Sequence, residues 1–353
     1  MFLDGRKEVI LRAIIDDYID TAEPIGSRTI AKKHELGLSS ATIRNEMADL
    51  EEMGYLAQPH TSAGRVPSNK GYRLYVDRLM ETRGLTPEEM EEINSLMEIK
   101  ISELNQLIKQ ASLIVSRVTK YTSMAMTPQI KKSTLKAVQV VPIESGKALV
   151  IVVTNAGVVK NSLVEIPYAV LPDYLIRISN MLNEKLYGLS LDQINLSFVN
   201  EVETEIGLSR EILMPVLNGV ADCIHRVDST EIILDGATNI LNHPEFRDVE
   251  KAKELFNIFD EKEVLCKLLE SVTHEKKGIN VRIGNENEIE EIKNCSLVTA
   301  SYSIGDTLVG SIGVIGPTRM EYARVISLMD FIRKRINAEL AKIFGGKVED
   351  ETP

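Results

Sequence analysis

The chain has 353 residues, 44% of them hydrophobic, and a formal net charge of −11, which suits two or three domains with cores of their own. Three scattered cysteines, Cys223, Cys266 and Cys295, exclude a disulfide framework, offer no metal-ligand spacing and indicate a reducing compartment such as the cytoplasm. No stretch is apolar over the length needed to cross a bilayer, and the N-terminus lacks an apolar signal core, so we expect no membrane partner.

The first fifty residues predict three short helices joined by tight connections. Apolar residues recur at every fourth position over residues 6–20, which gives one apolar helix face. A second helix is expected over residues 27–34, and a third over residues 41–53. Either Ser39 or Ser40 is placed to cap the third helix, because a serine at this position can accept a free backbone N–H.

The third of these helices has one face suited to reading DNA. Ile43, Met47 and Leu50 share the other face and are expected to pack on the first two helices. Opposite them the small side chains allow the backbone to approach a groove floor. Arg44 is suited to contact guanine or phosphate, and Asn45 is suited to bidentate contact with adenine, although a merely solvated role for Asn45 stays open.

A basic ribbon follows the three helices. Residues 55–59 and 65–67 predict two strands around a Gly-containing tip, and Ser68 is placed to cap a fourth helix. Residues 55–76 contain three basic residues, one histidine and no Asp or Glu. In an acidic protein this local absence of acid favours phosphate contact. Residues 1–83 hold 12 basic and 13 acidic residues and the remainder holds 29 and 39, so DNA contact is expected only in the first domain.

Together these elements predict a winged helix-turn-helix. Such a module can also bind proteins, but the basic wing favours double-stranded DNA, with the N-terminal end of the third helix in the groove. Arg65 and Arg73 are assigned to phosphates. The full set of expected DNA-binding side chains is Ser40, Thr42, Arg44, Asn45, His60, Thr61, Arg65, Lys70 and Arg73.

The rest of the chain predicts an α+β arrangement. A capping box at Thr86 opens a helix whose apolar seam runs over about 30 residues to Val118, and packing on its own sheet or on a partner subunit both stay open. Strands are expected at 135–143, 147–154, 157–166, 279–283, 296–303 and 308–315, and helices at 172–186, 210–227, 248–259, 262–272 and 320–344. Strands on both sides of a helical stretch suggest one sheet domain with an insertion.

Enzyme motifs are missing from the sequence. There is no phosphate-binding loop of the G-x-x-x-x-G-K-[ST] type and no dinucleotide-binding G-x-G-x-x-G, and the five histidines form no metal-binding cluster. We therefore expect no enzyme activity, no metal and no cofactor. A small-molecule-responsive regulator is the alternative, in which residues 284–291 line a ligand pocket, although a solvated loop is the favoured explanation of that segment.

Five segments resemble one family of bacterial repressors. The runs IGSRTIA at 25–31, SATIRNEMADLE at 40–51 and HTSAGRVP at 60–67 are similar to the DNA-reading region of the heat-inducible transcription repressor HrcA family. The run GVIGPTRMEY at 313–322 and the segment 239–246 resemble the same family. The resemblance covers nearly the whole chain, and the DNA-reading region shows no departure from the family pattern.

The resemblance implies a fold and a function. The sheet domain would be GAF-like, the insertion would dimerise, and the dimer would bind an inverted-repeat operator called CIRCE upstream of chaperonin and DnaK-type operons. The chaperonin GroEL would maintain the activity of the repressor, and this activity would be lost on heat shock. The expected boundaries are 1–83 for the winged helix, 84–166 and 246–346 for the GAF-like domain, 167–245 for the insertion and 347–353 for a disordered tail.

Overall fold

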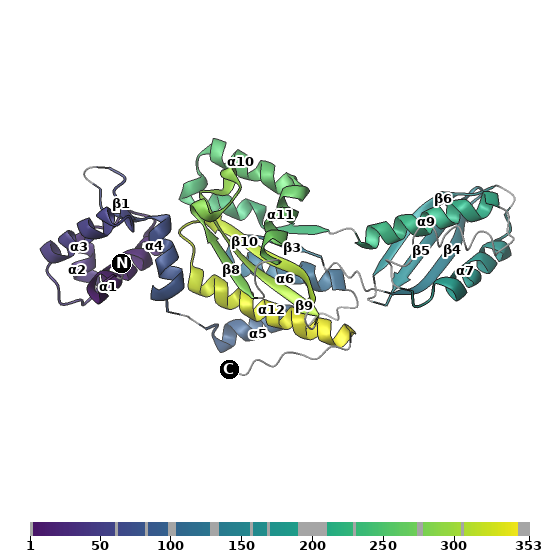
Figure 1. Ribbon diagram of the computed structural model, residues 1–353, viewed down its shortest axis with the longest axis horizontal. Helices are drawn as coiled ribbons and strands as arrows, with labels where there is room; N and C mark the ends of the chain where they lie inside the picture. Colours follow the sequence, from purple (N-terminus) through teal and green to yellow (C-terminus); the bar gives the residue numbers. More distant parts are fainter. Residues whose placement is uncertain are drawn as a thin grey trace.

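The computed structural model arranges the chain as three units along one long axis (Figure 1). The N-terminal unit lies at one end, an α+β core lies in the middle and a smaller sheet-and-helix unit lies at the other end. The structure describes residues 3–60, 63–81, 84–97, 104–127, 134–155, 158–167, 170–189, 210–228, 231–273, 278–304 and 307–344. Thr61 and the expected disordered tail at 347–353 lie outside these residues.

The N-terminal unit is the expected winged helix-turn-helix. Its elements are α1 (Gly5–Thr21), α2 (Ser27–Lys33), α3 (Ser40–Glu52), β1 (Leu56–Ala57), β2 (Val66–Pro67), α4 (Asn69–Leu74) and the π-helical turn η1 (Tyr75–Leu79). The predicted apolar faces meet in its core, where Ile10, Ile14, Ile43 and Leu50 are fully buried. Burial of these side chains stabilises the three-helix arrangement, because each short helix alone would be marginal in water.

The wing is closed by a tight backbone approach at Gly64. Strand β1 pairs antiparallel with β2, and Arg65 pairs with Ile25 in an additional bridge. A Cβ atom on Gly64 would lie 2.4 Å from the carbonyl oxygen of Ile25. Only glycine therefore allows the base of the wing to lie against the connection before α2.

The core is built on a five-stranded antiparallel sheet. The strand order is β7 (Ile232–Asp235), β3 (Thr122–Met126), β10 (Thr307–Pro317), β9 (Cys295–Ile304) and β8 (Ile279–Ile283). Helices α6 (Leu104–Thr119) and α12 (Tyr322–Phe344) cover one face, while α10 (Val249–Asp260) and α11 (Lys262–Thr273) cover the other. The α+β class and the GAF-like arrangement expected from the sequence are therefore confirmed.

The long helix predicted after residue 86 is two helices. Helix α5 (Pro87–Met97) begins with the expected capping box, and it packs against α6 instead of continuing into it. Ile93, Ile108 and Val115 of the predicted seam are buried in the core that α6 forms with the sheet. The seam thus packs on the protein's own sheet, which was one of the two alternatives. The prediction of one continuous helix was wrong.

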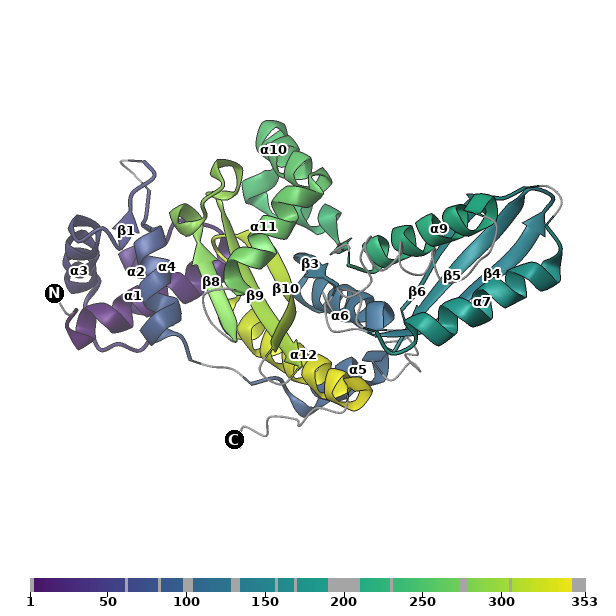
Figure 2. The same cartoon turned by 45° about the vertical axis from the view of Figure 1, so that its right-hand side comes forward.

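The inserted unit begins earlier than expected. Strands β4 (Leu135–Glu144), β5 (Lys147–Thr154) and β6 (Val159–Glu165) form a separate three-stranded sheet, covered on one face by α7 (Pro172–Leu186) and α9 (Arg210–Asp228). This unit has its own apolar core, and it lies apart from the large sheet at one end of the molecule (Figure 2). Assigning residues 135–166 to the GAF-like domain was therefore wrong, because β3 and β7, which the sequence pattern did not reveal, take those places in the larger sheet.

Short 3-10 turns complete the core around these elements. They are η3 (Ala237–Asn242) and η4 (Pro244–Phe246) after β7, and η5 (Gly284–Glu286) and η6 (Glu290–Ile292) between β8 and β9. The side-chain amide of Asn287 is buried between the last two turns and donates to the carbonyl oxygens of Gly284, Ile292 and Cys295. The segment 284–291 is therefore a structured connection held from inside.

Candidate nucleic-acid interface

Helix α3 presents the face that the sequence predicted for groove reading. Its N-cap is Ser39, whose hydroxyl oxygen accepts the backbone N–H of Thr42 at 3.1 Å and lies 2.9 Å from the Thr42 hydroxyl. Ser40 is the first helical residue, so it is placed at the N-terminal end without being the cap. Arg44 and Asn45 are exposed one turn further on.

Two acidic residues of α3, Glu46 and Asp49, are held on the side that faces α1. The Nζ atom of Lys7 lies 2.6 Å from a carboxylate oxygen of Glu46 and 3.0 Å from one of Asp49. These two carboxylates raise the pKa of Lys7 above its ordinary value, chiefly through the hydrogen bond with Glu46. Within the described part of the chain, no ion pair involves Arg44. The guanidinium of Arg44 is therefore available to a ligand, whereas the carboxylates are already neutralised in part.

The wing residues differ in how free they are. His60 is exposed at the start of the tip. The guanidinium of Arg65 lies 2.8 Å from a carboxylate oxygen of Glu51, and its side chain is only 20% exposed. Lys70 is exposed, yet its ammonium group donates to the carbonyl oxygen of Met53 at 2.8 Å and lies 4.3 Å from the ring centroid of Tyr55. If Arg65 or Lys70 contacts phosphate, its charged group must bind the phosphate in addition to its partners within the protein.

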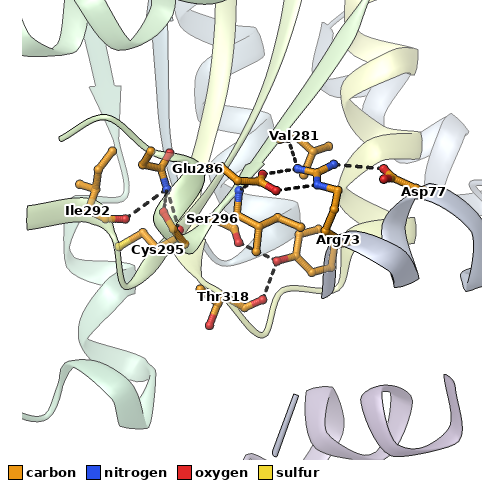
Figure 3. Close-up of polar contacts among 12 residues, drawn as sticks. Arg73, Asp77, Val281, Glu286, Ile292, Cys295, Ser296 and Thr318 are labelled. Carbon is orange, nitrogen blue, oxygen red and sulfur yellow. Dashed lines mark hydrogen bonds and ion pairs between the residues drawn. The ribbon is translucent and has the colours of Figure 1, made fainter. Parts of the chain in front are cut away.

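Arg73, which was expected to contact phosphate, is engaged by the core, and its phosphate role stays a prediction. Its guanidinium donates to both carboxylate oxygens of Glu286, to the carbonyl oxygen of Val281 at 2.6 Å and to Asp77 at 3.1 Å (Figure 3). Glu286 raises the pKa of Arg73 most, and Asp77 adds to the effect. The side chain is thus directed at the core. A count of local charge predicts a basic region but not the partner of each side chain.

Two further basic residues lie where a DNA backbone contact is expected. Arg28 and Lys32 are exposed on α2, one helical turn apart. In helix-turn-helix proteins the first helix of the motif crosses the phosphate backbone while the second enters the groove. The sequence signal was present in the run 25–31, where a basic residue follows the Ser27 start, but only the third helix and the wing were assigned contacts.

The segment proposed as a ligand loop contacts the winged helix. Glu286 in η5 accepts from Arg73, and Gly284 approaches so closely that a Cβ there would overlap the side chain of Asn69 in α4. Five of residues 284–291 are exposed, as a solvated loop predicts, and Ile289 and Glu291 line one cavity, so a ligand role of this segment stays a prediction. Two cavities, of about 330 and 340 Å³, are lined by helices and connections and by no strand of the large sheet.

Two other kinds of site are absent from the described residues. Among the residues that the structure describes, no three His, Cys, Asp or Glu side chains are grouped to hold a metal ion. In the same described ranges, no helix has both the length and the hydropathy that crossing a bilayer requires.

A winged helix-turn-helix joined to an α+β core with an inserted unit defines a multidomain transcription regulator. Residues 105–326 match the family model described as HrcA protein C terminal domain. The chain is 56% identical to the heat-inducible transcription repressor HrcA of Acetivibrio thermocellus, with 98% of both chains covered. It is 59% identical to that of Ruminiclostridium cellulolyticum, over 97% of this chain and 99% of the relative. The chain therefore belongs to the HrcA family of heat-inducible transcription repressors, which is not a class of enzymes.

One solved structure supports the fold independently. A crystal structure of a hypothetical protein at 2.2 Å resolution superposes with a TM-score of 0.71, covering 97% of this chain and all of the other. The two sequences are 22% identical, so this similarity concerns the fold alone.

Proposed function

We propose that the protein represses heat-shock chaperone operons by binding an inverted-repeat operator of the CIRCE type as a symmetric dimer. The observation that carries the proposal is the exposed N-terminal half of α3, where Arg44 and Asn45 project from a helix whose other face is buried. Ser40 and Thr42 lie at the same end, and Arg28 and Lys32 on α2 are placed to hold the phosphate backbone.

Asn45→Ala tests this assignment. A bidentate contact with adenine is worth about 1–3 kcal/mol against the wrong base, so operator affinity should fall by that amount while affinity for a scrambled duplex hardly changes. Asn257→Ala provides a matched control, because Asn257 is also exposed on a helix but lies in α10 of the core. Equal losses on both duplexes would assign Asn45 to phosphate contact and contradict the orientation proposed for α3.

Arg28→Ala tests the part proposed for α2. Loss of one phosphate contact should weaken binding to operator and scrambled duplexes alike and lower the slope of affinity against salt by about one unit. Binding titrations at two or more salt concentrations measure this slope. A loss confined to the operator would show that Arg28 reads bases instead.

Dimerisation is proposed through the open face of the three-stranded sheet. On the face opposite α7 and α9, side chains paired across the three strands form three rows. The middle row contains two amide side chains, and the rows on either side of it are apolar. The rows are Val141, Leu149 and Leu163; Gln139, Ile151 and Asn161; and Ala137, Val153 and Val159. Leu163 and Val159 remain 57% and 50% exposed. A second copy of the same face, related by a two-fold axis, would cover apolar rows and provide amide partners for the middle row.

The heat response is proposed to depend on the chaperonin GroEL, as the family resemblance implies. Active repressor should lose operator binding when warmed through the heat-shock range, and GroEL with ATP should restore it. Footprinting of the protein on chaperone promoters, before and after warming and with or without chaperonin, measures both steps. Binding that is unchanged by warming and insensitive to chaperonin would contradict this part of the proposal without affecting DNA recognition.

A further inference from the structure

Two sequence segments that DNA contact does not explain meet where the winged helix joins the core. The guanidinium of Arg319, just before α12, donates to Glu245 in η4 at 2.6 Å. It also donates to the carbonyl oxygen of Ile19, near the end of α1, at 2.8 Å. The Arg319 side chain is only 13% exposed. One side chain thus links the N-terminal unit to two separate parts of the core.

The chemistry of this contact requires an arginine. The last four carbonyl groups of an α-helix lack intrahelical partners, and Ile19 lies among them in α1. A cation near this helix end interacts favourably with the helix dipole. The planar guanidinium offers donors in two directions at once, so it can bind the Ile19 carbonyl and the Glu245 carboxylate together, which the single ammonium of lysine does poorly.

A second anchor holds the same unit from α4. Arg73 binds Glu286 and the Val281 carbonyl, as described above, and the adjacent Tyr72 ring lies 5.9 Å from the ring of Tyr322. Because the two anchors start from α1 and α4, rotation of the winged helix about either one is opposed by the other.

The Tyr322 side chain is itself held in place. Its hydroxyl donates to the carbonyl oxygen of Thr318 at 2.6 Å and lies 2.6 Å from the hydroxyl of Ser296 (Figure 3). Buried residues of the winged helix and of the core belong to one continuous apolar cluster. The N-terminal unit is therefore docked on the core through packed side chains and does not depend on the linking segment alone.

We propose that the Arg319–Glu245 and Arg73–Glu286 pairs form a junction clamp that fixes the angle of the winged helix on the core and thereby selects the spacing of the two operator half-sites. In a symmetric dimer, both recognition helices reach the groove together only if this angle matches the separation of the half-sites. Arg319 and Arg73 are positioning residues in this account. The inference rests on the proposed dimeric operator binding and adds the part of the chain that sets its geometry.

The test compares spacing profiles. The probes are duplexes carrying the inverted repeat found by footprinting, the same repeat with its spacer changed by one or two base pairs, and a duplex with a single half-site. Each added base pair rotates one half-site by about 34°, since a helical turn takes about 10.5 base pairs. The wild-type protein should prefer the native spacing sharply. Arg319→Ala should bind the native repeat about tenfold or more weakly, because part of the bivalent advantage is lost.

Affinity for the single half-site separates positioning from folding. It should stay within about twofold of wild type in Arg319→Ala, because the reading face on α3 is intact. The spacing profile should flatten. Glu286→Gln and Arg319→Lys are milder changes that should also flatten the spacing profile. If Arg319→Ala loses half-site binding through unfolding, these two variants test the clamp. Arg333→Ala is the matched control, because Arg333 pairs with Asp330 within α12 and away from the junction.

Two negative results have different meanings. A sharp wild-type profile that all three clamp variants retain would overturn the clamp while leaving the dimeric operator model in place. A wild-type protein that binds the repeat no better than a single half-site would overturn the dimeric operator model, and the clamp with it.

Discussion

Leu163→Asp should separate the proposed dimer into folded monomers. Leu163 is 57% exposed on the open face of the inserted sheet, so a partner has roughly half of a leucine side chain left to cover. Full burial of a leucine is worth about 1.5–3 kcal/mol, which makes the available part about 1–1.5 kcal/mol per copy. A two-fold interface contains the residue twice, so about 2–3 kcal/mol is lost, or about 30- to 150-fold in the dissociation constant. Burial of the new carboxylate adds to this loss.

Sedimentation of the full chain over a range of concentrations measures the effect. The far-UV circular dichroism of Leu163→Asp should match that of the wild type, because the side chain contributes little to the core of the inserted unit. Ile176→Asp is the matched control, since Ile176 is 54% exposed on α7, on the covered side of the same sheet. An unchanged dissociation constant for Leu163→Asp, or an equal loss for both variants, would refute the assignment of this face.

Three further outcomes follow from the packing. Gly64→Ala should destabilise the winged helix by about 1–3 kcal/mol and weaken DNA binding. The new methyl group would overlap the Ile25 carbonyl, and this backbone group cannot move aside as a flexible side chain can. Thermal melts measure the loss of stability, and operator titrations measure the loss of binding. Burial raises the pKa of Cys223 to about 11 and that of Cys295 to about 12, so a thiol reagent at pH 8 should label only Cys266 quickly, and rapid labelling of all three in the native state would be inconsistent with the burial. Calorimetry should show the inserted unit melting separately from the rest, whereas a single transition with equal calorimetric and van't Hoff enthalpies would contradict two independent cores.

The winged helix was predictable because its signals are local. Helical periodicity and serine caps act within a few residues, and they located α1, α2 and α3 closely. The capping box before α5 was found for the same reason. The packing of α5 against α6 was not predictable, because the apolar spacing continues from one helix to the other and no local pattern reports the contact between them.

Two short strands explain the misplaced boundary of the insertion. All five residues of β3 are buried, so the strand lacks the alternation that marks a half-exposed strand, and β7 has only four residues. Without them the conspicuous strands β4, β5 and β6 seemed to belong to the large sheet. The pairing of β3 with β7 joins residues more than a hundred positions apart, which no local pattern reports.

Partners of charged side chains were the least predictable feature. Arg73 and Arg65 lie in the same basic stretch, yet one is directed at Glu286 in the core and the other at Glu51 in α3. The sequence correctly indicated that acid is absent locally, but the carboxylates that pair with these residues are supplied by other elements. Arg44 remained available because the acids beside it on α3 are turned toward α1.

The separation of the two cores bears on how heat acts. The winged helix shares a continuous core with the large sheet, whereas the proposed dimer face belongs to a unit with a core of its own. That unit is inserted between β3 and β7, which are neighbours in the large sheet, so it can lose structure without breaking the sheet. Warming that melts the inserted unit first would leave a folded winged helix that still binds a half-site but has lost its partner. Since paired binding is much stronger than single binding, loss of the dimer alone would be enough to release the operator.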